Sequence, residues 1–116
     1  MSSQRVYPLA GYFKPSDGEP IRSIVTESAQ ASIVAWHVRP GQRILPHVHP
    51  HGQDTWTVLS GQGDYQIEAD GQTVPIAAGD VVVAPLGCVH GVLNTGLLPL
   101  VFVSVVCPAE AGFVPV

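Results

Sequence analysis

The chain has 116 residues, a net charge of −4 and only 12% charged residues, against a usual share of about one quarter. This length fits one domain that can bury a hydrophobic core. The five Lys and Arg residues are scattered, which excludes a basic patch for a nucleic-acid backbone or an anionic membrane. So few charges leave little to solvate a monomer surface, and we expect a partner to cover part of it.

The two cysteines, Cys88 and Cys107, show neither CxxC spacing nor a disulfide-dense pattern. Two free thiols in a reducing compartment are therefore expected. The first residues lack the apolar stretch of a signal peptide. The longest apolar run, residues 96–107, is interrupted by Pro99 and Ser104 and is too short to span a bilayer. The sequence thus predicts a soluble cytoplasmic protein.

From the N-terminus, residues 1–20 are rich in Pro and Gly and show no helical periodicity. They are expected to form an arm, or a short edge strand around residues 6–9. After that, β-prone runs alternate with turn residues such as Asp70-Gly71, a hairpin signal. Besides the histidine segment described below, the runs cover residues 21–26, 31–38, 55–60, 64–69, 73–76, 81–84, 89–94 and 98–107.

About nine short strands without a helix are typical of an all-β sandwich or barrel. We therefore expect one β domain over residues 21–116. In its last strand, residues 98–107, both alternating sets of side chains are apolar. A strand that is apolar on both faces is covered on both faces. In a small barrel only one face is interior, so we expect the other to pack on a second sheet or on a second subunit of a homodimer.

Between Gly41 and Gly61, three histidines alternate along the chain: His47, His49 and His51. Strand residues two apart point to the same face. Imidazoles at 47 and 49 can therefore aim at one point, and an acid across the following turn can aim there too. Neutral imidazole and carboxylate are ligands of zinc, iron, manganese and nickel. The segment predicts a mononuclear metal site.

A second segment has its own regular spacing. Five residues separate Gly79 from Pro85, two separate Gly87 from His90, and three separate His90 from Asn94. Together with the first segment, it resembles the two sequence motifs of the cupin superfamily, over residues 41–94. The resemblance implies a small single-domain cupin: a double-stranded β-helix, or RmlC-like jelly-roll barrel.

The resemblance also implies one divalent ion near the barrel mouth, held by His47, His49, His90 and the acid of the first motif. Cupins usually have Glu in that last position. Here the position falls on Asp54 or on its neighbour Gln53. The shorter Asp side chain is a conservative departure from the family pattern.

Alternation favours Asp54 over Gln53. Asp54 shares a strand face with Trp56 and Val58, while Gln53 shares one with threonines. The more apolar face is expected to point into the barrel, and an anionic oxygen is the better ligand for a divalent ion. Gln53 remains the alternative ligand.

Further residues near the two motifs could line the pocket: Trp36, Trp56, Phe102, His51, Cys88 and Arg43. Plain core packing is the alternative for the three aromatic residues. His51 is flanked by Pro50 and Gly52, which favours a position at the rim over one among the ligands. Cys88, two residues before His90, could face the same cavity, and Arg43 could meet an anionic substrate at the mouth.

No Asp, Glu, Tyr or Lys stands out as a dedicated general base, which favours chemistry at the metal centre itself. Cupins include dioxygenases, isomerases and lyases of this kind. We therefore expect a small metal-dependent enzyme that acts on a small polar metabolite with Fe, Mn, Ni or Zn. The alternative is a non-catalytic cupin that binds or senses a small molecule, because a fold alone does not decide function.

Overall fold

The computed structural model describes residues 4–116, which are almost entirely β structure. Ten strands and one short 3₁₀ helix are found among these residues. Their bounds are η1 Leu9–Gly11, β1 Ser23–Glu27, β2 Ser32–Val38, β3 Arg43–Val48, β4 Gln53–Ser60, β5 Gln62–Gln66, β6 Thr73–Ala77, β7 Val81–Ala84, β8 His90–Leu93, β9 Leu100–Cys107 and β10 Val114–Pro115. No helix in this described part is long and apolar enough to cross a membrane.

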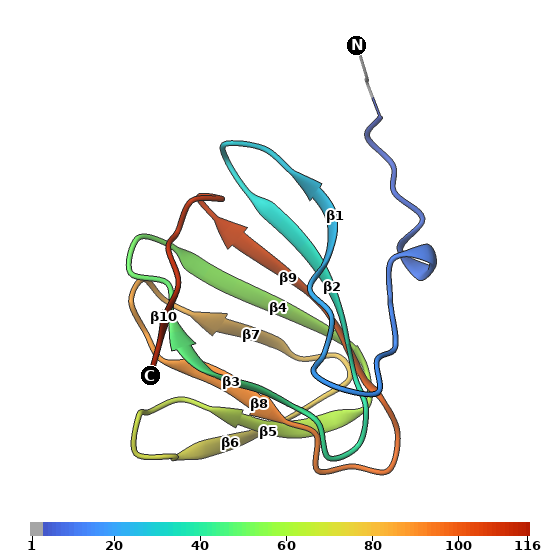
Figure 1. Cartoon of the computed structure of the whole chain (residues 1–116), viewed down its shortest axis with the longest axis vertical. Coiled ribbons are helices and arrows are strands. Elements are labelled where there is room, and N and C mark those ends of the chain that lie inside the picture. Colours follow the sequence, from blue (N-terminus) through green and yellow to red (C-terminus); the bar gives the residue numbers. More distant parts are fainter. Residues whose placement is uncertain (1–3) are drawn as a thin grey trace.

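The strands form two antiparallel five-stranded sheets that face each other (Figure 1). One sheet has the order β1-β2-β9-β4-β7 and the other β10-β3-β8-β5-β6. Gly61 joins β4 to β5 with a φ of 82°, and a Cβ there would collide with the carbonyl oxygen of Pro99. Glycine is the residue that accepts both constraints. The predicted all-β double-stranded β-helix is confirmed.

The core lies between the sheets and follows the alternation of the strands. On β4, Asp54, Trp56 and Val58 are buried while the residues between them are more exposed. On β9, the inward set that begins with Leu100 and Phe102 is buried. The outward valines of β9 are half-buried in the single chain, so this face is apolar without being fully covered.

The N-terminal segment forms no strand in residues 4–20, so the edge-strand alternative does not hold there; residues 1–3 of the predicted arm lie outside the described residues. Instead, the segment is fastened to the turn between β2 and β3. The side-chain amide of Gln42 donates to the carbonyl oxygens of Ser16 and Gly18, at 2.7 and 2.6 Å. Arg39 forms an ion pair with Asp17. The result is an arm held at one edge of the barrel.

The C-terminal strand β10 was not expected from the sequence. It consists of Val114 and Pro115, which pair with Val48 and His47 of β3. Two residues that include a proline carry no strand signal of their own. This short strand nevertheless brings the last residues of the chain to the strand that carries His47.

Candidate metal centre

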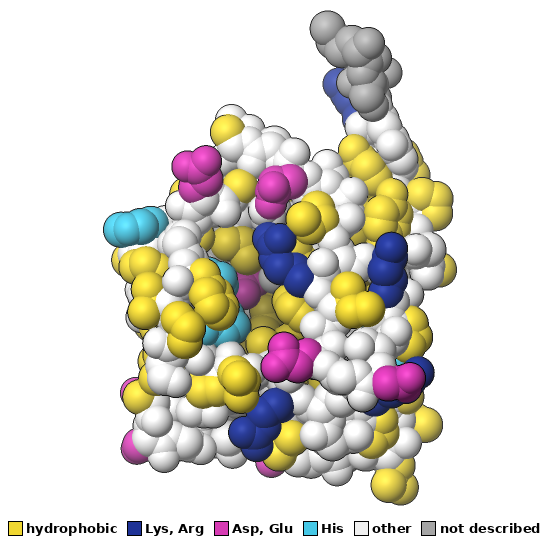
Figure 2. All heavy atoms as spheres, viewed as in Figure 1, with side chains coloured by type: hydrophobic (Ala, Val, Ile, Leu, Met, Phe, Trp, Pro, Cys, Tyr) yellow, Lys and Arg dark blue, Asp and Glu magenta, His cyan; other side chains and the backbone are white. Residues whose placement is uncertain are grey.

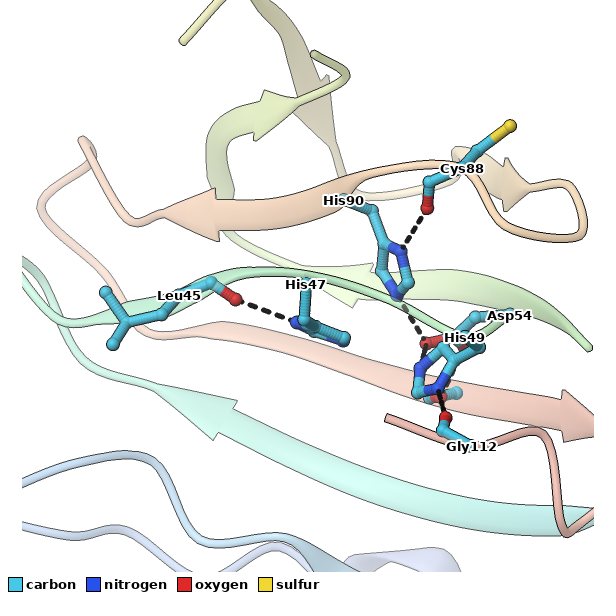
Figure 3. Close-up of polar contacts among 8 residues, drawn as sticks. Leu45, His47, His49, Asp54, Cys88, His90 and Gly112 are labelled. Carbon is cyan, nitrogen blue, oxygen red and sulfur yellow. Dashed lines mark hydrogen bonds and ion pairs between the residues drawn. The ribbon is translucent and has the colours of Figure 1, made fainter. Parts of the chain in front are cut away.

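Four side chains from both sheets meet between the layers: His47, His49, Asp54 and His90 (Figure 3). One nitrogen or carboxylate oxygen from each lies within 4.8 Å of those of the other three. His47, Asp54 and His90 are buried, and His49 is half-buried. The structure thus brings together the four residues that the sequence and the family resemblance singled out.

Strand pairing explains why the histidines converge. In the sheet register, His47 of β3 lies opposite His90 of β8. The two strands approach closely at Gly91, where a Cβ would lie 2.8 Å from the carbonyl oxygen of Ile44. Asp54 reaches the same point from β4 in the opposite sheet, on the inward face of that strand.

Backbone carbonyls orient all three imidazoles. The Nδ1 atoms of His47, His49 and His90 lie 2.7, 2.7 and 3.1 Å from the carbonyl oxygens of Leu45, Gly112 and Cys88. A carbonyl oxygen only accepts hydrogen bonds, so each Nδ1 must carry the hydrogen. Each Nε2 is then left to face the centre, the arrangement typical of metal-bound histidine.

Asp54 supplies a carboxylate to the same centre. Its Oδ1 accepts a hydrogen bond of 2.6 Å from the Ser104 hydroxyl, and its Oδ2 lies 3.0 Å from Nε2 of His90 and 3.5 Å from Nε2 of His49. Burial raises the pKa of Asp54, but hydrogen bonds with the two histidines and Ser104 outweigh burial and hold the pKa well below its usual value. The group is therefore an anion at neutral pH.

The charges of the isolated cluster are consistent with a cation at its centre. Burial, with smaller effects of neighbouring charges, lowers the pKa of His47 to about 4, so this imidazole is neutral at pH 7. The hydrogen bond with Asp54 raises the pKa of His49, against the effect of burial. In the neutral state, Nε2 of His49 and Nε2 of His90 would each turn a lone pair toward an anionic oxygen of Asp54, which is repulsive unless a proton or a metal ion lies between them. Three nitrogens and one oxygen are a ligand set for zinc, iron, manganese or nickel.

Gln53 and His51 lie outside this cluster. Gln53 is exposed, and its amide nitrogen contacts the Thr55 hydroxyl at 3.2 Å. The alternation of β4 turns it away from the barrel interior, as the apolar pattern indicated. His51 is also exposed, in the turn before β4. Neither residue has a donor atom in the group of four.

A cavity of about 1000 Å³ opens beside the cluster, and Figure 2 shows the hollow with histidine and acidic side chains inside it. Trp36, Trp56 and Arg43, three of the residues considered for the pocket, line it. Phe102 does not line it: this ring is fully buried behind the wall and stacks on Trp56 with centroids 4.1 Å apart. It has a packing role.

Cys88 contributes its backbone and not its thiol. Its carbonyl oxygen accepts the hydrogen bond from His90, while the sulfur points away from the cluster and is exposed (Figure 3). The strand β8 begins only at His90, so residue 88 lies in the preceding loop. Strand alternation therefore does not turn its side chain inward.

Sequence reasoning missed the contributions of Ser104, Arg22 and the residues after β9. Ser104 stands among apolar residues on the inward face of β9, and this single polar position was an available signal. The sequence around Gly112 and Phe113 carries no comparable signal. The Phe113 ring packs on His47 with centroids 4.9 Å apart, and Arg22 lines the cavity from just before β1.

Comparison with known proteins agrees with the fold and the motifs. The family model of the Cupin domain matches residues 34–106, so the chain belongs to the cupin family. It is similar over 97% of both chains, with 49% identity and a TM-score of 0.93, to an uncharacterized conserved protein with a double-stranded β-helix domain from Klebsiella pneumoniae. An RmlC-like cupin protein from Desulfovibrio desulfuricans shares the fold at 24% identity and a TM-score of 0.79, covering 91% of this chain and 98% of the other.

One curated relative is Polyketide synthase CurC from Streptomyces cyaneus, which is 32% identical over 59 residues. The match covers 51% of this chain and 37% of that protein. The chain therefore matches well under half of the length of this relative.

Proposed function

We propose that this cupin is a metal-dependent enzyme that holds one divalent ion of Fe, Mn, Ni or Zn per chain through His47, His49, His90 and Asp54. The observation that carries the proposal is the orientation of the three imidazoles. Nε2 of His90 and Nε2 of His49 lie 3.0 and 3.5 Å from the Asp54 carboxylate, and His47 brings a third nitrogen to the same cluster beside a cavity. Without a cation or extra protons, this arrangement is electrostatically unfavourable.

A bound ion would supply Lewis-acid activation of a carbonyl or water, or, for iron, dioxygen chemistry. The chain's own residues supply position and environment. Ser104 fixes the carboxylate of Asp54, and Trp36 and Trp56 form apolar walls that keep water from part of the cavity. This combination suits a dioxygenase or an isomerase or lyase acting on a small polar metabolite.

The residues available for proton transfer are few. In the described lining, the carboxylates are Asp54, already assigned as a ligand, and Glu19, which is exposed at the rim. Tyr65 is buried, and burial raises its pKa well above the usual value. This scarcity supports chemistry at the metal centre. It equally supports the alternative proposal, a non-catalytic cupin that binds or senses a small molecule.

The outward face of the sheet that contains β9 supports a homodimer. Val101, Val103 and Val105 of β9 are half-buried there, and Val81 and Val83 of the edge strand β7 are 64% and 47% exposed. We propose that two chains pack through this face, which light scattering coupled to gel filtration would test. The two free cysteines fit a cytoplasmic location, where thiols stay reduced.

The metal proposal is tested by elemental analysis of protein purified without added metal and then loaded with zinc. We expect one ion per chain in the wild type. The double variant His47→Ala/His49→Ala should lose the ion. The matched variant His51→Ala, which removes an exposed imidazole outside the cluster, should retain it. Stoichiometric metal in the double variant would refute the site.

Catalysis is tested separately from metal binding. The metal-loaded protein is incubated with a panel of small polar metabolites, while NMR follows product formation and an electrode follows dioxygen. Product that appears with the wild type and not with the double variant would support an enzyme. A metabolite that binds and is recovered unchanged would support the binding module.

A further inference from the structure

Two of the five Lys and Arg residues of the chain, Arg22 and Arg43, line the cavity beside the candidate metal centre. They come from different places: Arg22 lies just before β1, and Arg43 is the first residue of β3. In Figure 2, basic side chains stand at the edge of the hollow that contains the histidines and the acid. A protein with a net charge of −4 thus has two guanidinium groups in its cavity lining, together with the exposed carboxylate of Glu19.

Neither guanidinium is strongly engaged by the protein. Arg22 lies 3.7 Å from Glu27, and both side chains are about half exposed, so the pair contributes little. The Glu27 carboxylate also accepts a hydrogen bond from Ser32. Arg43 has no ion-pair partner in the described part of the chain. Both therefore have donors available for a ligand.

Arg22 lines the same cavity as the candidate ligands His49 and Asp54. Ser23 of β1 pairs with Ala35 of β2, so the preceding residue, Arg22, falls beside Trp36, which lines the same cavity. Arg22 and Arg43 are both exposed residues of the lining. Arg22 is thus placed to contact a molecule that lies beside the metal centre.

The rest of the wall suits an apolar body. Trp36, Ile44 and Trp56 line the cavity together with Arg22. A planar guanidinium matches the two oxygens of a carboxylate with two parallel hydrogen bonds. An available guanidinium beside aromatic and aliphatic walls is a pattern for a carboxylate with a hydrophobic portion.

We propose that Arg22 determines substrate specificity and that the substrate is a small organic acid. Its carboxylate is received by Arg22 and its apolar portion lies against Trp36 and Ile44. Turnover of this acid rests on the proposed function, but its recognition by Arg22 does not. Arg43 attracts the anion at the mouth and contributes less to its affinity.

The test compares two ligands of the same shape, 3-phenylpropionate and its neutral amide, by calorimetry or NMR titration. Metal-free protein is used first, because there the acid has no ion to coordinate. We expect the acid to bind about tenfold more tightly than the amide, the effect of hydrogen bonds to a charged group. Arg22→Gln should remove this preference and leave amide binding unchanged, which also shows that the cavity is intact.

Three further variants complete the design. Arg22→Lys keeps the charge without the planar fork and should retain part of the preference. Arg43→Gln should reduce it less than Arg22→Gln. Arg5→Gln removes the same charge from the exposed arm outside the cavity and should not change it.

The opposite results separate this inference from the proposed function. Equal binding of acid and amide, or a preference that survives Arg22→Gln, would overturn the role of Arg22. A preference that arises only after zinc loading and survives Arg22→Gln would assign the carboxylate to the ion, overturning the role of Arg22 while supporting the metal site. A preference that depends on Arg22 in a protein that binds no metal would uphold Arg22 and refute the metal proposal.

Discussion

The floor and the rim of the cavity are built in different ways. The floor, defined as His47, His49, Asp54 and His90, lies on or next to central strands, and backbone carbonyls orient its imidazoles. The rim includes Glu19 and Arg22 before β1 and Phe113 after β9, and these residues are exposed. In this molecule, the candidate metal centre lies on or next to paired strands, while residues of the terminal segments line the rim.

The largest expected effect comes from the floor. Asp54→Ala removes the anionic ligand and should weaken zinc affinity by about 100-fold or more, since loss of an outer-shell partner alone costs 10–100-fold. Gln53→Ala, at the adjacent and outward-facing position, should leave affinity unchanged. Competition with a chromophoric chelator measures both. A larger loss for Gln53→Ala would move the fourth ligand to that residue.

The next largest effect is expected for the hydrogen bond from Ser104 that holds the carboxylate of Asp54. Ser104→Ala should lower zinc affinity about tenfold and destabilise the metal-free fold by about 1–3 kcal/mol, because a buried charged group loses a partner. Denaturant unfolding and chelator competition measure the two effects. Ser60→Ala, at the exposed end of β4, is the control. Equal effects of the two variants would contradict the role of Ser104.

Lower pH should release the ion from the floor. Imidazole must be neutral to bind a metal, and the pKa of His49 lies above 6.5 because of its hydrogen bond with Asp54, against burial. As the pH is lowered, zinc affinity should therefore start to decrease while the pH is still above 6.5, and it should keep decreasing at lower pH. Affinity that stays flat from about pH 8 to 5 would contradict imidazole ligation.

The metal-free fold should respond to pH through His47 in a separate way. Its folded pKa of about 4 is below the ordinary 6.5 because of burial and nearby charges. As pH falls from 6.5 to 4, the unfolded chain takes up a proton that the folded chain does not, so stability decreases. His49 acts oppositely, because its raised pKa gives stability that is present below pH 6.5 and lost as pH rises through the folded value. Urea unfolding of wild type and His47→Gln across this range isolates the His47 contribution, and identical slopes would contradict it.

The smallest effect is expected at the rim. Phe113 is 63% exposed although its ring packs on His47. Phe113→Ala should change stability by less than about 1 kcal/mol and leave zinc affinity nearly unchanged, while the dissociation rate of a cavity ligand increases. Leu98→Ala, which removes an apolar side chain that is 69% exposed and lies outside the cavity lining, is the control. A loss of zinc affinity as large as that for Ser104→Ala would show that Phe113 supports the candidate metal ligands of the floor.

The difference between the floor and the rim also explains which parts of the site could be predicted from the sequence. Strand alternation has a period of two, so it placed Asp54 inside and Gln53 outside correctly, and the motif spacing pointed to the three histidines. Alternation does not report depth, which is why Phe102 packs behind the wall instead of lining it. It also does not extend beyond a strand end, so Cys88 in the loop before β8 faces outward.

The rim was harder to predict because its residues come from segments without periodicity. Nothing in the order of residues before β1 indicates that Arg22 returns to the cavity. The pairing of Val114 and Pro115 with β3 likewise depends on a loop after β9 that the sequence does not specify. Such positions are fixed by tertiary contacts and not by local propensity.

The carbonyl of Gly112 that orients His49 has a consequence for protein synthesis. His49 is made 63 residues before its hydrogen-bond partner, so a nascent chain emerging from the ribosome contains all four side chains of the cluster before the carbonyl that orients His49. Ion capture should accordingly be delayed until the last strands have been translated and paired. A chain terminated just short of residue 112 would carry all four side chains and still lack the group that orients His49.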